Sequence, residues 1–310
     1  TLVSFVMGII GGVGALWTVT ICAGLLALAA GTSYAFREFL VTNAPREIAK
    51  ELRTAPLTAA FGLFVIFTYA VAGIFAPVIA PFGEAEVIST AFAPPDEQML
   101  LGADQLGRDM FSRLVFGARN TVGIALVATS LAFLMGAFMG LLAATKGGWF
   151  DQLMGRVADV IMSIPSLIFA LLMLSIFGTN LVVIVVIIAI IYSPRVFRLT
   201  RAVAGNVVVM DYIEAAKLRG EGTWYSTAPL VAEFGLEFCF VFLLISGLSF
   251  LGLGIQPPTA DWGSMVRENA TLISFGEITP LIPAAAIALL TVAVNFVVDW
   301  MLYRSSGLKG

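Results

Sequence analysis

The chain has 310 residues, of which 59% are hydrophobic and only 12% are charged, and its formal net charge is −3. Soluble globular domains carry roughly 25% charged residues, so this composition excludes an ordinary soluble protein and indicates an integral membrane protein. The slightly acidic balance also excludes a nucleic-acid-binding protein, which needs a basic face. The sequence contains no histidine, and so lacks the commonest metal ligand and general base. We therefore expect membrane lipid as a partner, no nucleic acid, and no metal or cofactor in this chain.

Seven apolar runs are candidates for membrane-spanning helices, since a span needs about 20 apolar residues. In chain order they cover roughly 2–31, 56–82, 119–145, 157–178, 179–194, 228–255 and 279–303. Backbone groups inside a bilayer must be hydrogen-bonded within the protein, so all seven are predicted to be helices. The short fifth run is predicted to end at Ser193-Pro194, because proline interrupts a helix. We interpret the first run as an extra span; a lost or altered N-terminus is the alternative.

The placement of lysine and arginine predicts the orientation, because basic residues concentrate in cytoplasmic loops. With segment 32–55 on the cytoplasmic side, the predicted cytoplasmic segments hold about three times as many basic residues as the outer segments, which favours this topology. The outer segments then hold only Arg108, Arg113, Arg119 and Arg267. Two long outer segments containing proline and glycine, about 83–118 and 256–278, are predicted to form a structured outer surface.

A polar, helix-prone segment from Asp211 to Gly220 interrupts the apolar sequence. Its adjacent alanines give a face without bulk, over which the groove of a partner can close. A carboxylate supplies a charge for docking, and the terminal glycine permits a sharp turn. We predict a short cytoplasmic helix that contacts a soluble partner. The candidate coupling residues are Glu214, Ala215, Ala216, Lys217 and Gly220.

Two further motifs are present, one in the first predicted outer segment and one at the outer end of the next-to-last predicted helix. In the first, Asp104, Gly107, Arg108 and Asp109 begin an amphipathic stretch. Its charges either hold an interfacial helix and shape the outer mouth, or form loop ion pairs worth about 0–1 kcal/mol when exposed. The second motif predicts a helix end followed by a rigid turn, which is either structural or a gate element. Its candidate residues are Gly252, Gly254, Pro257 and Pro258.

Glu233 and Glu237 lie four residues apart in an apolar run, and so on one helix face. Carboxylates inside a membrane are costly and usually face a cavity or a partner. The pair is a candidate pore or cavity site that binds a substrate amine. The alternative is a position near the cytoplasmic interface, within reach of water or basic groups. Asp159, Asp299 and Arg195 have the same ambiguity.

Two pairs of glycines, Gly8 with Gly12 and Gly136 with Gly140, have the four-residue spacing that lets membrane helices approach closely. This spacing predicts helix contacts and says nothing about a substrate.

Together these motifs resemble a known family of transporters. Glu214-Ala-Ala followed by x-x-x-Gly220 is similar to the coupling motif of ABC importer permeases. The blocks at 101–119 and 248–263 resemble blocks of the dipeptide/oligopeptide/nickel importer family, and Asn295 and Asp299 fit its closing pattern. The chain is similar to the second, C-type permease of such importers. The resemblance implies an all-α integral membrane protein with a six-helix permease core, to which the extra N-terminal transmembrane helix is added.

The expected organisation follows from these blocks. An N-terminal hydrophobic helix covers 1–36, and a cytoplasmic linker follows at 37–55. The first core helix and the outer loop cover 56–118. The permease core covers 119–304, with its coupling loop at about 195–228, and a cytoplasmic tail covers 305–310.

The resemblance implies a non-enzymatic, multi-pass transport subunit of the bacterial inner membrane that forms half of a translocation pathway. Its partners would be a homologous second permease, two ABC ATPase subunits and an external substrate-binding protein. No phosphate-binding loop G-x-x-x-x-G-K-[ST] occurs in the sequence, so ATP and Mg would bind in the ATPase subunits. Peptides or related small solutes are the expected cargo, with dipeptides, oligopeptides, nickel chelates and opines left open.

The chain departs from the family pattern after Gly220. The expected Ile-x-Leu-Pro element is absent, and the join near Tyr225–Ala228 is short. Either this is a true deletion or residues are missing from the sequence. An ATP-independent facilitator or secondary transporter, or an inactive relative, is therefore the alternative function. An intramembrane enzyme is disfavoured, because it needs a nucleophile–base or metal constellation.

Overall fold

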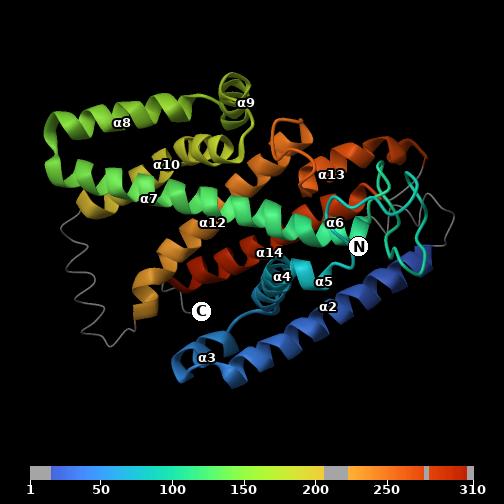
Figure 1. The fold of residues 1–310 in the computed structure, drawn as a ribbon. Coiled ribbons are helices and arrows are strands. Elements are labelled where there is room, and N and C mark those ends of the chain that lie inside the picture. The colour runs from blue at the N-terminus through green and yellow to red at the C-terminus, as the bar shows by residue number, and fades with distance from the viewer. Residues whose placement is uncertain (1–14, 206–222, 276–278, 306–310) are drawn as a thin grey trace.

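The computed structural model describes residues 15–205, 223–275 and 279–305, and in this part of the chain the regular structure is helical. Its main elements are α2 (Ala15–Asn43), α3 (Arg46–Arg53), α4 (Leu57–Ile74), α5 (Ala76–Ile79), α6 (Met110–Gly117), the π-helical turn η1 (Ala118–Val122), α7 (Gly123–Lys146), α8 (Gly148–Ser163), α9 (Ser166–Phe177), α10 (Leu181–Gly205), α12 (Thr223–Phe250), α13 (Trp262–Asn269), the 3-10 turn η2 (Ala270–Phe275) and α14 (Leu281–Ser305) (Figure 1). The only β-pairing among these residues is two isolated bridges in the outer segment, Val87 with Arg108 and Ala103 with Asp109. The expected all-α class is confirmed.

Five segments of the described chain are long and apolar enough to cross a membrane: Leu57–Ile74, Met110–Lys146, Leu181–Ala202, Val231–Phe250 and Leu281–Arg304. Helices α8 and α9 form a sixth if the pair is counted as one span, although they meet at 92°. The six-helix core is thus present. Its third member is not the continuous run predicted at 157–178, because the chain breaks at Ile164 and Pro165.

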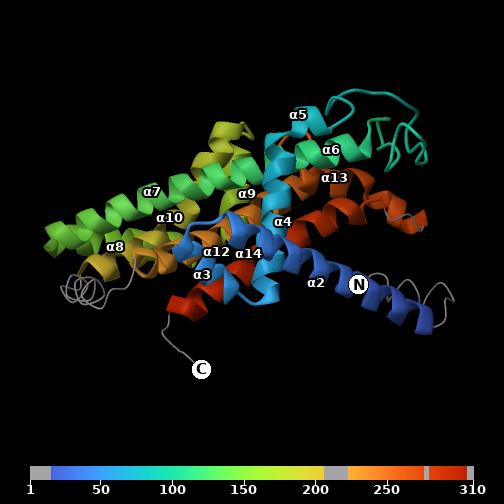
Figure 2. The same ribbon diagram turned by 90° about the horizontal axis from the view of Figure 1, so that it is seen from below.

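Helix α2 lies along the edge of the bundle beside α4 (Figures 1 and 2). The ring of Phe36 packs against Phe64 and Phe67 of α4, with centroids 5.4 and 5.3 Å apart. This helix is not among the five spans, and residues 1–14 lie outside the described residues. The extra N-terminal transmembrane helix therefore stays a prediction. The predicted linker 37–55 is largely helical, since α2 continues to Asn43 and α3 follows.

The expectation that the fifth run ends at Pro194 is wrong, because α10 continues through this proline to Gly205. Proline cannot donate the backbone hydrogen bond to the carbonyl four residues earlier, that of Ile190. The hydroxyl of Ser193 donates to this oxygen instead, at 3.3 Å. A neighbouring serine thus supplies the missing donor, which is one way in which membrane helices tolerate proline.

Helices α7 and α10 lie side by side along the bundle (Figure 1). A Cβ atom on Gly136 would lie 2.5 Å from Ser193 O, and one on Gly140 would lie 2.8 Å from Phe197 O. The predicted close approach at these two glycines is confirmed. Gly8 and Gly12 lie outside the described residues.

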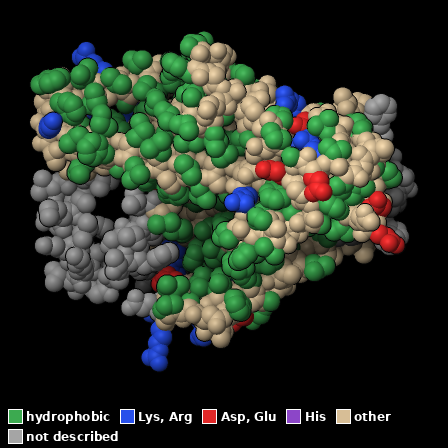
Figure 3. Space-filling model, in the orientation of Figure 1, with side chains coloured by type: hydrophobic (Ala, Val, Ile, Leu, Met, Phe, Trp, Pro, Cys, Tyr) green, Lys and Arg blue, Asp and Glu red, His purple; other side chains and the backbone are tan. Residues whose placement is uncertain are grey.

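The two ends of the bundle differ. Figure 2 shows α5, α6 and α13 at one end and α3 with the C-terminal end of α14 towards the other. Hydrophobic side chains are spread over the whole described part of the face in Figure 3, and acidic side chains gather towards the end that carries α6 and α13. In the predicted topology this is the outer end.

Candidate functional site

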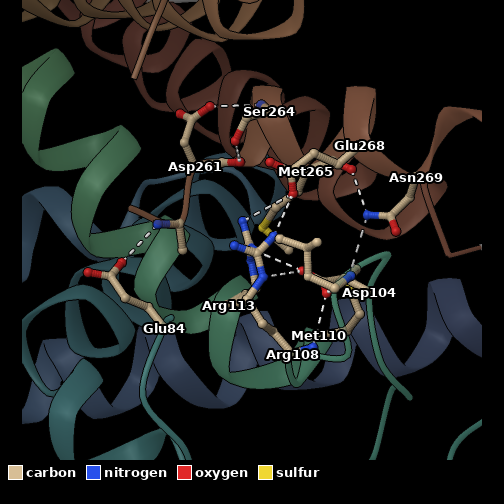
Figure 4. Close-up of polar contacts among 12 residues, drawn as sticks. Glu84, Asp104, Arg108, Met110, Arg113, Asp261, Ser264, Met265, Glu268 and Asn269 are labelled. Atoms are coloured by element: carbon tan, nitrogen blue, oxygen red, sulfur yellow. Dashed lines mark hydrogen bonds and ion pairs between the residues drawn. The ribbon is translucent and has the colours of Figure 1, made fainter. Parts of the chain in front are cut away.

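Four charged side chains form a buried cluster at the outer end (Figure 4). Asp104 Oδ2 lies 2.7 Å from Arg108 Nε and 2.8 Å from Arg113 Nη1. Glu268 of α13 completes the cluster, with its Oε2 atom 3.0 Å from Arg108 Nη2 and 3.3 Å from Arg113 Nη2. Each of the four side chains is 6% exposed or less. Two cations thus balance two carboxylates, and the outer segment is joined to α13.

The segment before α6 is shaped by this cluster. Asp104 Oδ1 accepts hydrogen bonds from the backbone N–H groups of Leu106 and Arg108 at 2.8 and 3.0 Å. Gly107 has φ of +76°, and a Cβ atom there would lie 2.0 Å from Ser89 O. Only glycine fits this turn, because other residues are strained at positive φ and the space is filled.

The helices α6 and α13 begin with the same cap. Asp109 Oδ2 accepts from Ser112 N at 2.8 Å, and Asp261 Oδ2 accepts from Ser264 N at 2.8 Å. Aspartate is among the preferred N-cap residues because its carboxylate pairs with free N–H groups of the first turn. Asp109 is therefore a helix cap, separate from the charged cluster that its neighbours form.

Asp261 also joins α13 to the π-helical turn η1. The hydroxyl of Thr121 donates to Asp261 Oδ1 at 2.9 Å. Burial raises the pKa of Asp261 above its usual 3.8, and the hydrogen bonds from Ser264 and Thr121 oppose this shift. Burial likewise raises the pKa of Glu268, against the influence of Arg108.

Trp262 fixes α13 on the membrane-spanning helices. Its indole N–H donates to Leu114 O at 2.9 Å, and its ring meets Tyr69 and Phe242 edge-on. A Cβ atom on Gly117 would lie 2.4 Å from the indole Cδ1 atom, so α6 contacts the ring directly. The outer helices are thus held to the bundle by polar and apolar contacts together.

The predicted helix end after Leu248 is present, since α12 stops at Phe250. Gly252 has φ of +87°, and Leu253 N donates to Leu248 O at 2.9 Å. A Cβ atom on Gly254 would lie 2.1 Å from Ser249 Oγ. The Pro257–Pro258 peptide bond that follows is cis.

A cavity of about 440 Å³ lies between the outer ends of α7 and α10 and this turn. It is lined by Arg119, Asn120, Gly123, Ile124, Val127, Thr179, Leu181, Ile184, Val185, Ile255, Gln256 and Thr259. The sequence analysis did not predict it, because its wall is assembled from three separate segments.

The two candidate carboxylates of α12 differ in their surroundings. Glu237 is 3% exposed, and its Oε1 atom lies 3.8 Å from Arg195 Nη1 of α10. Glu233 is half-buried one turn towards the inner end. Of the ambiguous charges, Asp159 forms an exposed pair with Arg198, and Asp299 lies near the end of α14.

A second ion pair, Asp151 with Arg201, joins α8 to α10 at the inner end beside that of Asp159 with Arg198. The predicted coupling residues Glu214, Ala215, Ala216, Lys217 and Gly220 lie outside the described residues. The short join near residues 225–228 falls within the first turns of α12. Helix α10 reaches Gly205, so the predicted loop from about 195 begins within a helix.

A family model described as the binding-protein-dependent transport system inner membrane component matches residues 136–306. The chain belongs to this family. It is 33% identical to a di/tripeptide transport system permease protein of Pseudomonas aeruginosa over 254 residues, 77% of this chain and 84% of the relative. A dipeptide transport system permease protein of Alkalihalophilus pseudofirmus is 31% identical over 264 residues, with 82% and 86% coverage. A glutathione transport system permease protein of Pectobacterium atrosepticum is 30% identical over 268 residues, with 82% and 88% coverage.

Membership of the family confirms the resemblance inferred from the motifs. This chain is a multi-pass membrane protein and a permease component of an ABC importer. Among the described residues, no group of three or more His, Cys, Asp or Glu side chains is placed to hold a metal ion.

Sequence reasoning found half of the charged cluster, Asp104 and Arg108, and missed the roles of Arg113 and Glu268. No local signal pointed to a further carboxylate, because Asp104 and Asp109 already match Arg108 and Arg113 in number along this segment. Its identity was hidden, because Glu268 is 160 residues away from Arg108.

Proposed function

We propose that this chain is one of two permease subunits of an ATP-driven importer of peptides or related small solutes in the bacterial inner membrane. The observation that carries this proposal is the similarity to relatives named for di/tripeptide, dipeptide and glutathione transport, all of which are small peptides. Each match covers more than three quarters of both chains, so the likeness includes the outer segment and the core.

The outer end suits docking by an external substrate-binding protein. The segment before α6 is held by the buried cluster, and it exposes Val87, Leu100 and Leu106. Exposed apolar side chains on a fixed support favour a protein contact. We assign Asp104, Gly107, Arg108 and Asp109 to the support of this surface, and Gly252, Gly254, Pro257 and Pro258 to the turn beside it.

Coupling would take place at the inner end. Separate ATPase subunits would bind ATP and Mg and contact the helix that contains Glu214 and Gly220. Helices α10 and α12 flank this segment in the chain. The pairs of Arg198 with Asp159 and Arg201 with Asp151 connect α10 to α8, so a displacement of one helix would reach the other. The second permease would supply the other half of the pathway.

The test is extraction of the tagged chain from its native membrane in a mild detergent, followed by identification of the proteins that accompany it. We expect a second permease and two ATPase chains in fixed proportion, and ATP-dependent peptide uptake once the complex is returned to liposomes with its binding protein. Recovery of the chain alone, or uptake without ATP, contradicts the proposal and favours a facilitator.

A further inference from the structure

Arg195 and Glu237 lie deep within the membrane-spanning region. Arg195 is 14 residues from the outer end of α10 at Leu181, and Glu237 is 13 residues from the outer end of α12 at Phe250. At 1.5 Å per residue, both are about 20 Å from these ends. With these ends at the outer boundary of a hydrocarbon core about 30 Å thick, the pair lies within the core and about 10 Å from its inner boundary.

The guanidinium of Arg195 is directed away from the cytoplasmic end. It lies over the ring of Phe240 at 4.7 Å and over the ring of Tyr192 at 5.4 Å. Tyr192 is one turn closer than Arg195 to the outer end of α10, and Phe240 is closer than Glu237 to the outer end of α12. The side chain therefore does not extend towards the inner water layer, as an arginine near a helix end does.

The pair is incomplete as a structural ion pair. The distance of 3.8 Å between Arg195 Nη1 and Glu237 Oε1 is longer than a hydrogen bond. Glu237 Oε2 is buried and has no hydrogen-bond partner among the described residues. Buried ion pairs are stabilising only when their geometry is good and their remaining polar atoms are hydrogen-bonded.

The two charged side chains also differ in how far they are exposed. Glu237 is 3% exposed, whereas the side chain of Arg195 is 40% exposed. Exposing a charged group to lipid at this depth is energetically unfavourable. The exposed part of the Arg195 side chain therefore faces a water-filled passage or another polar group. Since Glu237 is covered, a solute in a passage would meet the arginine and not the carboxylate. This argues against a substrate amine as the ligand of Glu237.

We propose that Arg195 is a binding site for a carboxylate of the transported solute inside the translocation pathway, with Glu237 as the counter-ion that balances it between transport events. The guanidinium matches a carboxylate with two parallel N–H···O bonds. The Tyr192 and Phe240 rings support the guanidinium, and the exposed part of the Arg195 side chain is accessible to a solute. The long contact with Glu237 leaves the donors available. This inference rests on the proposed function and names the solute group that the permease recognises.

The test uses the complete importer in liposomes, with its binding protein and ATP. Uptake is measured for a dipeptide with a free carboxyl terminus and for its C-terminal amide, each supplied at a concentration that saturates the binding protein. In Arg195→Gln we expect uptake of the free peptide to fall about tenfold or more, the size of one charged hydrogen bond, and uptake of the amide to stay near wild type. Uptake of the free peptide by Arg195→Lys should lie between that of the wild type and that of Arg195→Gln.

A charge exchange separates recognition from a structural pair. The double variant Arg195→Glu with Glu237→Arg keeps opposite charges but places a carboxylate at the open position. We expect the complex to assemble and to lose uptake of the free peptide. Arg198→Gln is the matched control, because Arg198 lies one turn nearer the inner end in an exposed pair with Asp159. It should leave the ratio of the two uptakes unchanged.

Three results overturn the inference: equal losses for both peptides in Arg195→Gln, wild-type uptake of the free peptide by the exchanged variant, or a loss of complex recovery with unchanged uptake per complex. The last would assign Arg195 to an ion pair with the second permease. If the wild-type complex shows no ATP-dependent uptake, the proposed function fails and this inference fails with it.

Discussion

The carboxylate of Asp104 and the guanidinium of Arg113 form an ion pair of 2.8 Å in which both side chains are 1% exposed. The same carboxylate oxygen also accepts from Arg108, and both arginines reach Glu268 of α13. In a chain with few charged residues, this cluster holds the outer segment to the bundle, so its loss has consequences for stability that an exposed pair would not have.

Replacement of Asp104 by alanine is expected to destabilise the outer end strongly. Removing one member of a buried charged network costs about 3–5 kcal/mol, because two arginines are left with one carboxylate. Thermal denaturation in detergent and proteolysis of the segment before α6 measure the effect. The control is Asp159→Ala, which breaks an exposed pair. Equal effects of the two variants would contradict a structural role of the cluster.

Gly136→Ala is expected to weaken the packing of α7 on α10. The new Cβ atom would meet Ser193 O at 2.5 Å, and overpacking of this kind costs about 1–3 kcal/mol. Gly123→Ala is the matched control on the same helix, since a Cβ atom there meets nothing within 4 Å. The midpoint of thermal denaturation should fall for the first variant only. A fall of the same size in both would show that glycine is not needed for the helix contact.

Ser193→Ala tests the hydroxyl that replaces the backbone donor lost at Pro194. It should cost about 0.5–1.5 kcal/mol, because the carbonyl of Ile190 loses its hydrogen bond. In a Pro194→Ala background the backbone N–H is restored, and the serine should matter less. A double-mutant cycle measures this coupling. Additive effects of the two substitutions would rule out the exchange of donors.

Asp261 is expected to make stability depend on pH. Its raised pKa means that, from its ordinary value of 3.8 up to the raised value, the folded protein binds more protons than the unfolded chain. Stability therefore falls as pH rises through this window. Asp261→Asn keeps an N-cap side chain without the charge, and should flatten the dependence. Denaturation midpoints of the two proteins across acidic pH measure it, and parallel curves would contradict the assignment.

Glu214→Ala and Gly220→Trp are expected to uncouple ATP hydrolysis from transport. The first removes the charge predicted to dock on the ATPase, and the second places a bulky side chain beside the predicted face of small residues. Uptake should fall severalfold or more while the permease still assembles in the membrane. Lys309→Ala, in the C-terminal tail, is the control. Intact uptake and intact stimulation of the ATPase in both variants would refute the predicted coupling role.

Local features of this molecule were predictable from the sequence. Apolar runs of span length become helices, because a backbone in lipid must satisfy its own hydrogen bonds. The glycine pair of α7 lies at its predicted close contact. The motifs around Asp104 and Gly252 also identified the family before any fold was known.

What the sequence by itself determined was the membrane environment, the number of core spans and the family, since these depend on composition and on short motifs within single segments. Only the tertiary structure decided that Glu268 completes the Asp104 cluster, that α10 passes through Pro194, and that Glu237 is covered while Arg195 is open. The physical reason is that these outcomes depend on which distant segment supplies a charge, a donor or a covering side chain. Such partners are set by helix packing, which the order of residues along one segment does not encode.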